Sequence, residues 1–258
     1  MTPNTSWDKQ ADWYDNLLSQ NLDSYQERVI KPNLLRLMAV KPGEKILDLA
    51  CGNGFFSAAF CKAGADVVGV DSSAKLIAIA KKTNHEIAFQ VDSADKLSSI
   101  TDQSIDQVAC IMAIQNMENI KGALAQVKRV LKSGGKFHLV MSHPAFRVPK
   151  QSSWGWDEKN KIQYRRIDRY LSESKVFIQM HPGLARHSSQ EAKAADTTLT
   201  FHRPLQYYFK LFKNAGLVVA NLEEWISDRV SEQGPRADAE NRIRQEIPLF
   251  LYIQAKHV

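Results

Sequence analysis

Cysteine and long apolar runs are scarce in this chain of 258 residues. Its three cysteines, Cys51, Cys61 and Cys110, are odd in number and form no C-x-x-C pair. They therefore predict neither a disulfide framework nor a cysteine-based zinc site, and we expect no metal. No stretch approaches the ~18 apolar residues of a transmembrane helix, and residues 1–18 lack the basic-then-apolar order of a signal peptide. These absences predict a cytoplasmic protein without a membrane segment.

Acidic residues are too few to balance the basic ones, and the imbalance is local. Residues 144–204 contain 11 Lys and Arg against 6 Asp and Glu, whereas the rest of the chain contains 23 against 22. The same segment has no clean helical or strand periodicity. We therefore expect a separate structural layer whose charge attracts an anionic partner.

Strand and helix signals alternate along most of the remaining chain. Residues 6–39 carry aromatic residues and leucines at helical spacing, and Lys41-Pro42-Gly43 is a turn. The strands expected after this turn are 45–49, 66–70, 87–91, 105–112, 136–141, 217–222 and 249–254. The helices expected among them are 53–63, 74–82, 120–131 and 205–214.

This alternation predicts an α/β fold with a mostly parallel sheet and helices on both faces. The last two strands have no convincing helix between them, so we expect an antiparallel pair at one edge. A single domain over 1–258 is expected, with N-terminal lid helices at 1–40. Its ligand-binding core would comprise 41–142 and 204–258. Residues 143–203 would be inserted as a substrate cap over the carboxyl ends of the strands, where ligands of such sheets bind.

A glycine-rich turn, Asp48-Leu49-Ala50-Cys51-Gly52-Asn53-Gly54, joins the first expected strand to the helix after it. Such a turn usually holds a nucleotide, because its glycines let the backbone approach the ligand. The dinucleotide pattern needs a third glycine where Ser57 stands, and Asp48 would repel a pyrophosphate. The turn therefore favours a nucleotide-like ligand that carries positive charge and no phosphate.

The turn resembles the first motif of class I S-adenosylmethionine (SAM)-dependent methyltransferases, Asp/Glu-x-Gly-x-Gly-x-Gly, with Ala50 in place of the first glycine. The resemblance covers residues 1–142, including RVLKSGG at 129–135, and 204–258 in outline, where it is to the ubiquinone and menaquinone biosynthesis type. It implies a Rossmann-like sheet of seven strands with an antiparallel last strand, and SAM as cofactor. The sulfonium cation of SAM suits a carboxylate at Asp48.

The resemblance also implies which residues hold SAM. Asp71, at the end of the second strand, would accept hydrogen bonds from both ribose hydroxyls. Asp92 would accept one from the adenine amino group, and Tyr14 of the lid would touch the cofactor, with a core aromatic as the alternative. The implied cofactor-binding residues are Tyr14, Asp48, Ala50, Cys51, Gly52, Asn53, Gly54, Asp71, Ser72, Asp92, Ser93, Ala94, Met112, Ala113, Asn116 and Met117.

Motifs that mark nucleic-acid methyltransferases are missing. Ile114-Gln115-Asn116-Met117 stands where adenine N6 enzymes have Asn/Asp-Pro-Pro-Tyr, and Cys110 lies inside an expected strand instead of a nucleophile loop. A small-molecule acceptor, anionic or aromatic and methylated on O, N or C, is therefore favoured. His143 is the candidate general base, with a structural histidine at the Pro144 turn as the alternative. The candidate substrate contacts are His143, Arg147, Trp154, His202 and Tyr207.

Other functions stay open at this point. The basic cap and its interleaved aromatic residues also suit RNA, and Arg165, Arg166 and Arg169 would then contact phosphates unless they form a solvated helix face. A protein methyltransferase and a catalytically silent SAM-binding module are further alternatives. A nicotinamide oxidoreductase is disfavoured by Ser57 and Asp48.

Overall fold

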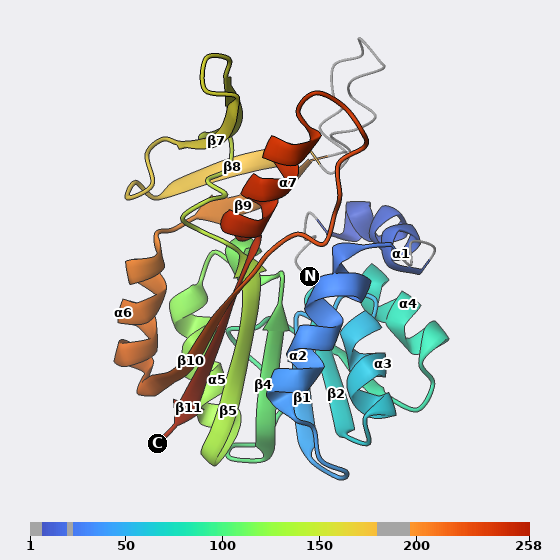
Figure 1. Ribbon diagram of the computed structural model, residues 1–258. Coiled ribbons are helices and arrows are strands. Elements are labelled where there is room, and N and C mark those ends of the chain that lie inside the picture. The colour runs from blue at the N-terminus through green and yellow to red at the C-terminus, as the bar shows by residue number, and fades with distance from the viewer. Residues whose placement is uncertain (1–6, 20–22, 180–196) are drawn as a thin grey trace.

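A seven-stranded sheet forms the centre of the computed structural model, which describes residues 7–19, 23–179 and 197–258. Its strand order is β10-β11-β5-β4-β1-β2-β3 (Figure 1). Strand β11 runs antiparallel to both of its neighbours, and the other pairings of this sheet are parallel. The predicted class is confirmed: an α/β fold with a mostly parallel seven-stranded sheet and an antiparallel last strand. The strands are β1 (Lys45–Leu49), β2 (Asp66–Asp71), β3 (Ala88–Val91), β4 (Ile105–Ile111), β5 (Leu131–Ser142), β10 (Leu217–Trp225) and β11 (Phe250–His257).

Helices cover both faces of this sheet and create one apolar core on each. Successive residues of β4 show the division, because Val108 and Cys110 belong to one core while Ala109 and Ile111 belong to the other. The thiol of Cys110 is fully buried, as expected for a small apolar residue in a strand. One face carries α5 (Ile120–Val130) and α6 (Leu205–Ala215), and the other carries α2 (Lys31–Met38), α3 (Phe55–Lys62) and α4 (Ala74–Thr83).

Capping side chains define where the helices beside the site begin. The Ser73 hydroxyl accepts a hydrogen bond from the Leu76 amide at 3.2 Å and begins α4, directly after β2. The Asn119 side chain accepts one from the Gly122 amide at 3.0 Å and begins α5. The Ser73 cap closely follows β2, and the Asn119 cap ends the segment that connects β4 to α5, so both fix connections at the carboxyl edge of the sheet.

The N-terminal helices lie above this carboxyl edge (Figure 1). They comprise η1 (Asp8–Gln10), α1 (Ala11–Ser19) and the π-helical turn η2 (Gln26–Ile30), which leads into α2. The helical character expected for 6–39 is therefore present in the described parts of that range. Within the described residues, no helix is both long and apolar enough to cross a membrane.

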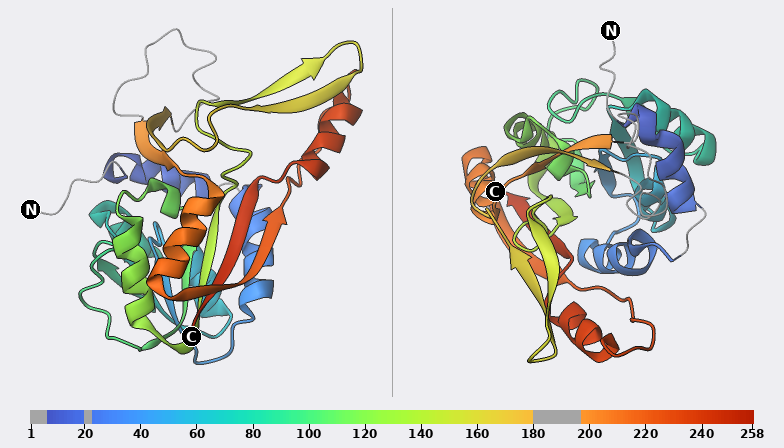
Figure 2. Two further views of the ribbon diagram at one scale, coloured as in Figure 1. Left: turned by 90° about the vertical axis from the view of Figure 1, so that its left-hand side faces the viewer. Right: turned by 90° about the horizontal axis from the view of Figure 1, so that it is seen from above.

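The inserted segment forms two antiparallel hairpins within its described residues. Strand β6 (Ser152–Asp157) pairs with β7 (Ile162–Ile167), and β8 (Ser174–Gln179) pairs with β9 (Thr197–His202). Figure 2 shows the β6–β7 hairpin projecting away from the sheet, whereas β9 lies close above it. Only part of the expected cap is therefore near the carboxyl edge of the strands.

One expectation about this region is wrong. A helix, α7 (Ala237–Glu246), lies between β10 and β11, where none was expected. Its sequence has no apolar stripe, and the described helix buries none of its residues. It contacts the projecting hairpin, where the guanidinium of Arg236 lies 4.7 Å from the ring centre of Trp156. The helix-face alternative for Arg165 and Arg166 is also wrong, because both lie in β7.

Candidate functional site

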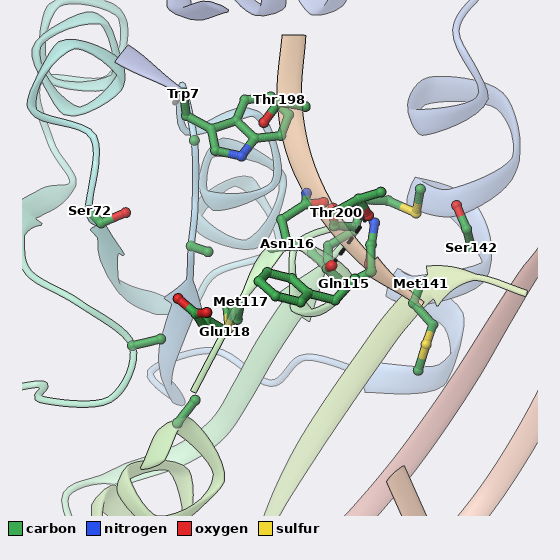
Figure 3. A pocket seen from close by; sticks show the side chains of 18 of the residues that line it. Trp7, Ser72, Gln115, Asn116, Met117, Glu118, Met141, Ser142, Thr198 and Thr200 are labelled. Atoms are coloured by element: carbon green, nitrogen blue, oxygen red, sulfur yellow. Dashed lines mark hydrogen bonds between the residues drawn. The ribbon is translucent and has the colours of Figure 1, made fainter. Parts of the chain in front are cut away.

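A cavity of about 870 Å³ opens at the carboxyl edge of the central sheet. Its floor comes from the ends of β1, β2, β4 and β5 and the loops that follow them, and α1 and the β8–β9 hairpin contribute further walls. Figure 3 shows Ser72 on one side, Met141 and Ser142 on the other, and Thr198 near the top beside Trp7. Segments distant in sequence thus enclose one space.

The glycine-rich turn supplies part of this floor as bare backbone. Ala50, Gly52 and Gly54 have φ values of +58°, +58° and +82°, and Ala50 and Gly52 line the cavity. Glycine adopts this left-handed region freely, whereas alanine is strained there. A Cβ atom on Gly52 would lie 3.0 Å from Cε1 of Tyr14, so the lid packs directly on the turn. Met112, after β4, is left-handed too, with φ +56°.

Asp71 connects the second strand to this turn and lines the cavity. Its carboxylate accepts hydrogen bonds from the Gly52 amide at 2.9 Å and the Ser73 amide at 2.8 Å. Burial raises the pKa of Asp71, and these backbone bonds oppose that rise. A carboxylate has about four acceptor positions, so capacity remains for two hydroxyl donors.

Asp48 lies beneath the turn and outside the cavity lining. It is 2% exposed, and its carboxylate accepts a hydrogen bond from the Ser57 hydroxyl at 2.6 Å. Burial raises the pKa of Asp48 to about 7. The serine that replaces the third glycine of the dinucleotide pattern is therefore the partner of this buried carboxyl group. Cys51, Asn53 and Gly54 also belong to the turn without lining the cavity.

The third and fourth strands bring further expected residues to the cavity. Asp92 accepts hydrogen bonds from the amides of Ser93 and Ser98, at 2.7 and 2.6 Å, which hold the loop after β3. The remaining expected residues that line the same cavity are Ser72, Ser93, Ala94, Met112, Ala113, Asn116 and Met117. Tertiary structure thus assembles most of the implied cofactor set from four separate loops and Tyr14 of the lid.

The lid is attached to the cofactor end by polar contacts. The Ser73 hydroxyl donates to Asp8 at 2.6 Å, Lys75 pairs with Asp12 at 2.6 Å, and the Asn53 amide donates to Asp15 at 2.9 Å. Trp7 and Tyr14 pack edge to face with ring centres 5.6 Å apart, and both line the cavity. Burial and then the charges of Asp71 and Asp48 raise the pKa of Tyr14.

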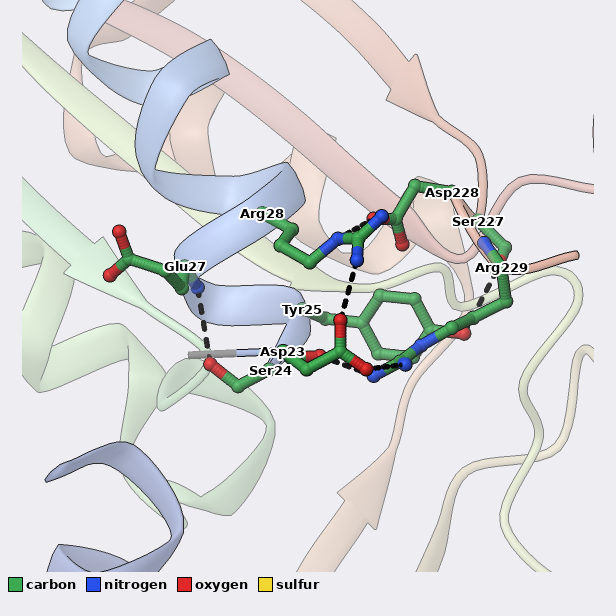
Figure 4. Close-up of polar contacts among 8 residues, drawn as sticks. All are labelled: Asp23, Ser24, Tyr25, Glu27, Arg28, Ser227, Asp228 and Arg229. Carbon is green, nitrogen blue, oxygen red and sulfur yellow. Dashed lines mark hydrogen bonds and ion pairs between the residues drawn. The ribbon is translucent and has the colours of Figure 1, made fainter. Parts of the chain in front are cut away.

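The part of the lid between α1 and α2 is attached to the β10 edge of the sheet. Asp23 accepts hydrogen bonds from both Arg28 and Arg229, and Arg28 also pairs with Asp228 (Figure 4). The Tyr25 hydroxyl is 2.9 Å from that of Ser227. The entry to α2 is therefore attached to the loop after β10 through an exposed network of charges.

His143 does not line the cavity. Its Nε2 lies 2.7 Å from Glu224, and its Nδ1 accepts a hydrogen bond from the Ala145 amide at 3.2 Å. Nδ1 therefore carries the lone pair and Nε2 the proton. Burial lowers the pKa of this ring, although Glu224 opposes the change, and the side chain is 3% exposed. The ring holds the turn at Pro144, which is the structural alternative stated above.

His202 does line the cavity. Its Nε2 is 2.7 Å from the carbonyl oxygen of Tyr170, which can only accept, so Nε2 carries the proton. Nδ1 then has a lone pair and makes no hydrogen bond to any residue that the structure describes. Strand β9 thus presents a histidine of fixed tautomer at the cavity.

The other expected substrate contacts divide into two groups. Arg147 lines the cavity, whereas Trp154 and Tyr207 do not. Trp154 lies in the projecting hairpin, 41% exposed, with the guanidinium of Arg165 at 4.8 Å from its ring centre. Tyr207 lies in α6, and the guanidinium of Arg203 is 5.5 Å from its ring centre.

Several lining residues were not expected from the sequence, among them Trp7, Trp13, Thr198, Thr200 and Arg203. The threonines alternate with Leu199 and Phe201 in TTLTFH, a period-two pattern that indicates a half-buried strand. That pattern could have predicted the strand from the sequence. No sequence pattern marks the tryptophans, because only their position above the glycine turn makes them cavity residues.

Two of the three arginines considered for RNA have partners inside the chain. Arg165 donates to the Phe146 carbonyl at 3.0 Å and to the Ser152 hydroxyl at 2.6 Å. Arg166 pairs with Asp168 at 2.8 Å. Arg165 and Arg166 are therefore engaged within the chain, and Arg169 is the remaining arginine of the three that were proposed as RNA contacts.

Residues 47–139 match a protein-family model described as a methyltransferase domain. This segment contains the glycine turn, Asp71 and Asp92. The motif order, the sheet topology and this match identify residues 47–139 as a methyltransferase domain of the class I SAM-dependent type, and SAM is the cofactor of that class.

Curated relatives match a part of the chain. A demethylmenaquinone methyltransferase from Renibacterium salmoninarum is 37% identical over 106 residues, covering 41% of this chain and 44% of the relative. A ubiquinone/menaquinone biosynthesis C-methyltransferase from Rubrivivax gelatinosus is 36% identical over 121 residues, covering 46% and 48%. The chain spans about half the length of these relatives.

Solved structures share the fold over most of the chain. An S-adenosylmethionine-dependent methyltransferase from Mesorhizobium loti superposes with a TM-score of 0.66 at 24% identity, covering 87% of this chain and 96% of that chain. A methyltransferase solved as a complex with the Haloferax volcanii Trm112 methyltransferase activator superposes with a TM-score of 0.63 at 19% identity, covering 98% of both chains. The likeness is one of fold.

Proposed function

We propose that this protein transfers the methyl group of SAM to a small-molecule acceptor inside the cavity. One observation carries the proposal: a single cavity extends from the glycine turn and Asp71 to the underside of β9. Cofactor and acceptor would therefore lie in one enclosed space. Holding two reactants in line and away from water supplies much of the acceleration of such a transfer.

The cofactor would occupy the end of the cavity formed by β1, β2 and β3. Asp71 would accept from the ribose hydroxyls, Asp92 would bind the adenine edge, and the backbone of Ala50 and Gly52 would follow the methionine portion. Met112 and Asn116 would surround the sulfonium end, and Tyr14 would cover it. When bound, SAM supplies an electrophilic methyl group. Asp48 would support the turn from below through its bond to Ser57.

The acceptor would lie under β9, where His202 is the proposed proton acceptor. The Tyr170 carbonyl supports this role because it keeps the proton on Nε2 and leaves the lone pair on Nδ1. A hydroxyl or amine acceptor must lose a proton as it is methylated, and a positioned base accelerates that loss. His143 is less suited, since contacts within the chain already use both of its ring nitrogens.

The relatives supply one defined acceptor to test, because their names state that they methylate demethylmenaquinone or act in quinone biosynthesis. The RNA alternative has less support, since Arg165 and Arg166 bind groups of their own chain. A protein acceptor has no observation in its favour. We therefore place small molecules first and treat quinones as one class among them.

Transfer of tritium from methyl-labelled SAM tests the proposal. The purified protein is incubated with cell extract, which is then separated into metabolite, RNA and protein fractions, and in a second reaction with reduced demethylmenaquinone. We expect label in the metabolite fraction with the wild type and, at a SAM concentration below the Kd, at least about tenfold less label with Asp71→Ala. Asp66→Ala is the matched control, because Asp66 is exposed at the opposite end of the same strand. Label confined to RNA or protein, or no label at all, would refute the proposal.

A further inference from the structure

The cavity carries opposite charges at its two ends. Asp71 and Asp92 line the end assigned to the cofactor. Arg147 lines the other end, on the loop that follows β5. Figure 3 shows the two sides, with Ser72, the neighbour of Asp71, opposite Ser142, where this loop begins. A cationic cofactor fits the first end, so the second end requires a separate explanation.

Arg203, the second arginine of the cavity lining, is fully engaged by the fold. It is 5% exposed and donates to the carbonyl oxygens of Met117 at 3.0 Å and Glu118 at 3.1 Å. Its guanidinium also lies 4.6 Å from the ring centre of Phe201. These contacts attach β9 to the loop after β4, and they account for this charge without a ligand.

Arg147 has no such partners. Its backbone amide donates to the His143 carbonyl at 2.9 Å, which closes the turn that carries it. Its guanidinium makes no ion pair and no side-chain hydrogen bond with any residue that the structure describes. A second cation lies nearby, since burial and then the charge of Arg147 lower the pKa of Arg165. Arg147 is thus a cation at the cavity with no anionic partner among the residues that the structure describes.

The tryptophans of the inserted segment give no support to an aromatic acceptor. Trp154 and Trp156 lie in the projecting β6–β7 hairpin and do not line the cavity. Strand β9 lines the cavity with the polar Thr198, Thr200 and His202 and with Phe201. The acceptor end therefore combines hydroxyl groups and an aromatic ring with the guanidinium of Arg147.

We infer that the acceptor is a small organic acid whose carboxylate binds the guanidinium of Arg147; this inference rests on the proposed methyl transfer. An arginine binds a planar carboxylate through two parallel hydrogen bonds, which also orients the rest of the molecule. Anchored in this way, the acid would place its nucleophilic atom between His202 and the cofactor. Arg147 is then a specificity-determining residue and takes no part in the chemistry.

Direct binding tests the inference without requiring turnover. The full-length protein is saturated with SAM and titrated with benzoate, hexanoate, phenyl phosphate and the uncharged benzamide, with binding followed by ligand-observed NMR. We expect benzoate or hexanoate to bind more tightly than benzamide. Arg147→Gln should weaken carboxylate binding about tenfold or more, and Arg147→Lys by less, because lysine keeps the charge and loses the forked geometry.

Two controls isolate the role of Arg147. Arg166→Gln removes the same charge from the neighbouring hairpin, at a residue paired with Asp168, and should leave carboxylate binding unchanged. SAM affinity, measured by calorimetry, should be the same in Arg147→Gln and in the wild type. A loss of SAM affinity in Arg147→Gln would mean that Arg147 binds the carboxylate of the cofactor, and would overturn the inference.

The remaining outcomes are also decisive. Equal binding of benzoate and benzamide, binding of neither, or a preference for phenyl phosphate would each overturn the assignment of a carboxylic acid. The labelled product of the extract reaction gives an independent readout, since it should bind an anion exchanger. A labelled product that does not bind the anion exchanger would refute the inference that the acceptor is an acid, but it would still support the proposed methyl transfer. The absence of any product refutes the proposed function itself, whatever the binding titration shows.

Discussion

Asp48→Asn should make the stability of the folded protein less dependent on pH. Asp48 is 2% exposed, and burial raises its pKa from the ordinary 3.8 to about 7. Between these values the folded protein keeps a proton that the unfolded chain has released, so the wild type loses stability as pH rises from about 4 to about 7. Asparagine preserves the shape and the carbonyl acceptor for Ser57 and carries no titrating proton.

The magnitude follows from the two pKa values. A difference of about 3 between them corresponds to about 4 kcal/mol at high pH, at about 1.4 kcal/mol for each pH unit. Roughly 2–3 kcal/mol of this develops between pH 5 and pH 8, because part is already lost at pH 5. The stability of Asp48→Asn relative to the wild type should therefore increase by that amount between these two pH values.

Urea unfolding of both proteins at pH 5 and pH 8 measures this change. Asp106→Asn is the matched control, because the pKa of Asp106 is lowered. Burial raises this pKa, but the hydrogen bonds from Lys132 and the Lys45 amide lower it by more. The contribution of that carboxylate is lost only as pH falls below its ordinary range, so its variant should show the same deficit at pH 5 and pH 8. If the stability of Asp48→Asn relative to the wild type does not increase between pH 5 and pH 8, Asp48 is ionised throughout and the reasoning is refuted.

Three further substitutions test the site. Asp71→Ala should weaken SAM binding by at least about tenfold, or about 1.4 kcal/mol, by calorimetry, and unchanged affinity in a folded variant would remove Asp71 from the site. His202→Gln should lower turnover about 100-fold while sparing SAM affinity, and unchanged turnover in a folded variant would exclude this base. His143→Ala should lower the thermal midpoint and keep turnover per folded molecule, whereas a stable but inactive variant would restore His143 as the base.

Local patterns were sufficient for the fold class and for which strand ends line the cavity. Alternating strand and helix signals predicted the sheet, because burial on both faces demands β-branched runs between amphipathic helices. The position of Asp71 and Asp92 at the cavity was predictable, because Asp71 ends β2, Asp92 directly follows β3, and parallel strands end at one edge of a sheet. Helix α7 was missed because it buries no residue, so it leaves no apolar periodicity to detect.

Tertiary structure decided what these residues do. The sequence placed Asp48 beside the ligand, yet the fold buries it against Ser57, nine residues away in the chain. The sequence predicted that the basic segment forms one cap, yet it forms two separate hairpins. Trp154 therefore lies outside the cavity lining, whereas Thr198, Thr200 and His202 belong to it. His143 and His202 look alike in the sequence. Only the fold separates them, because Glu224 and the Ala145 amide contact both ring nitrogens of His143. Among the described residues, the Tyr170 carbonyl contacts only Nε2 of His202.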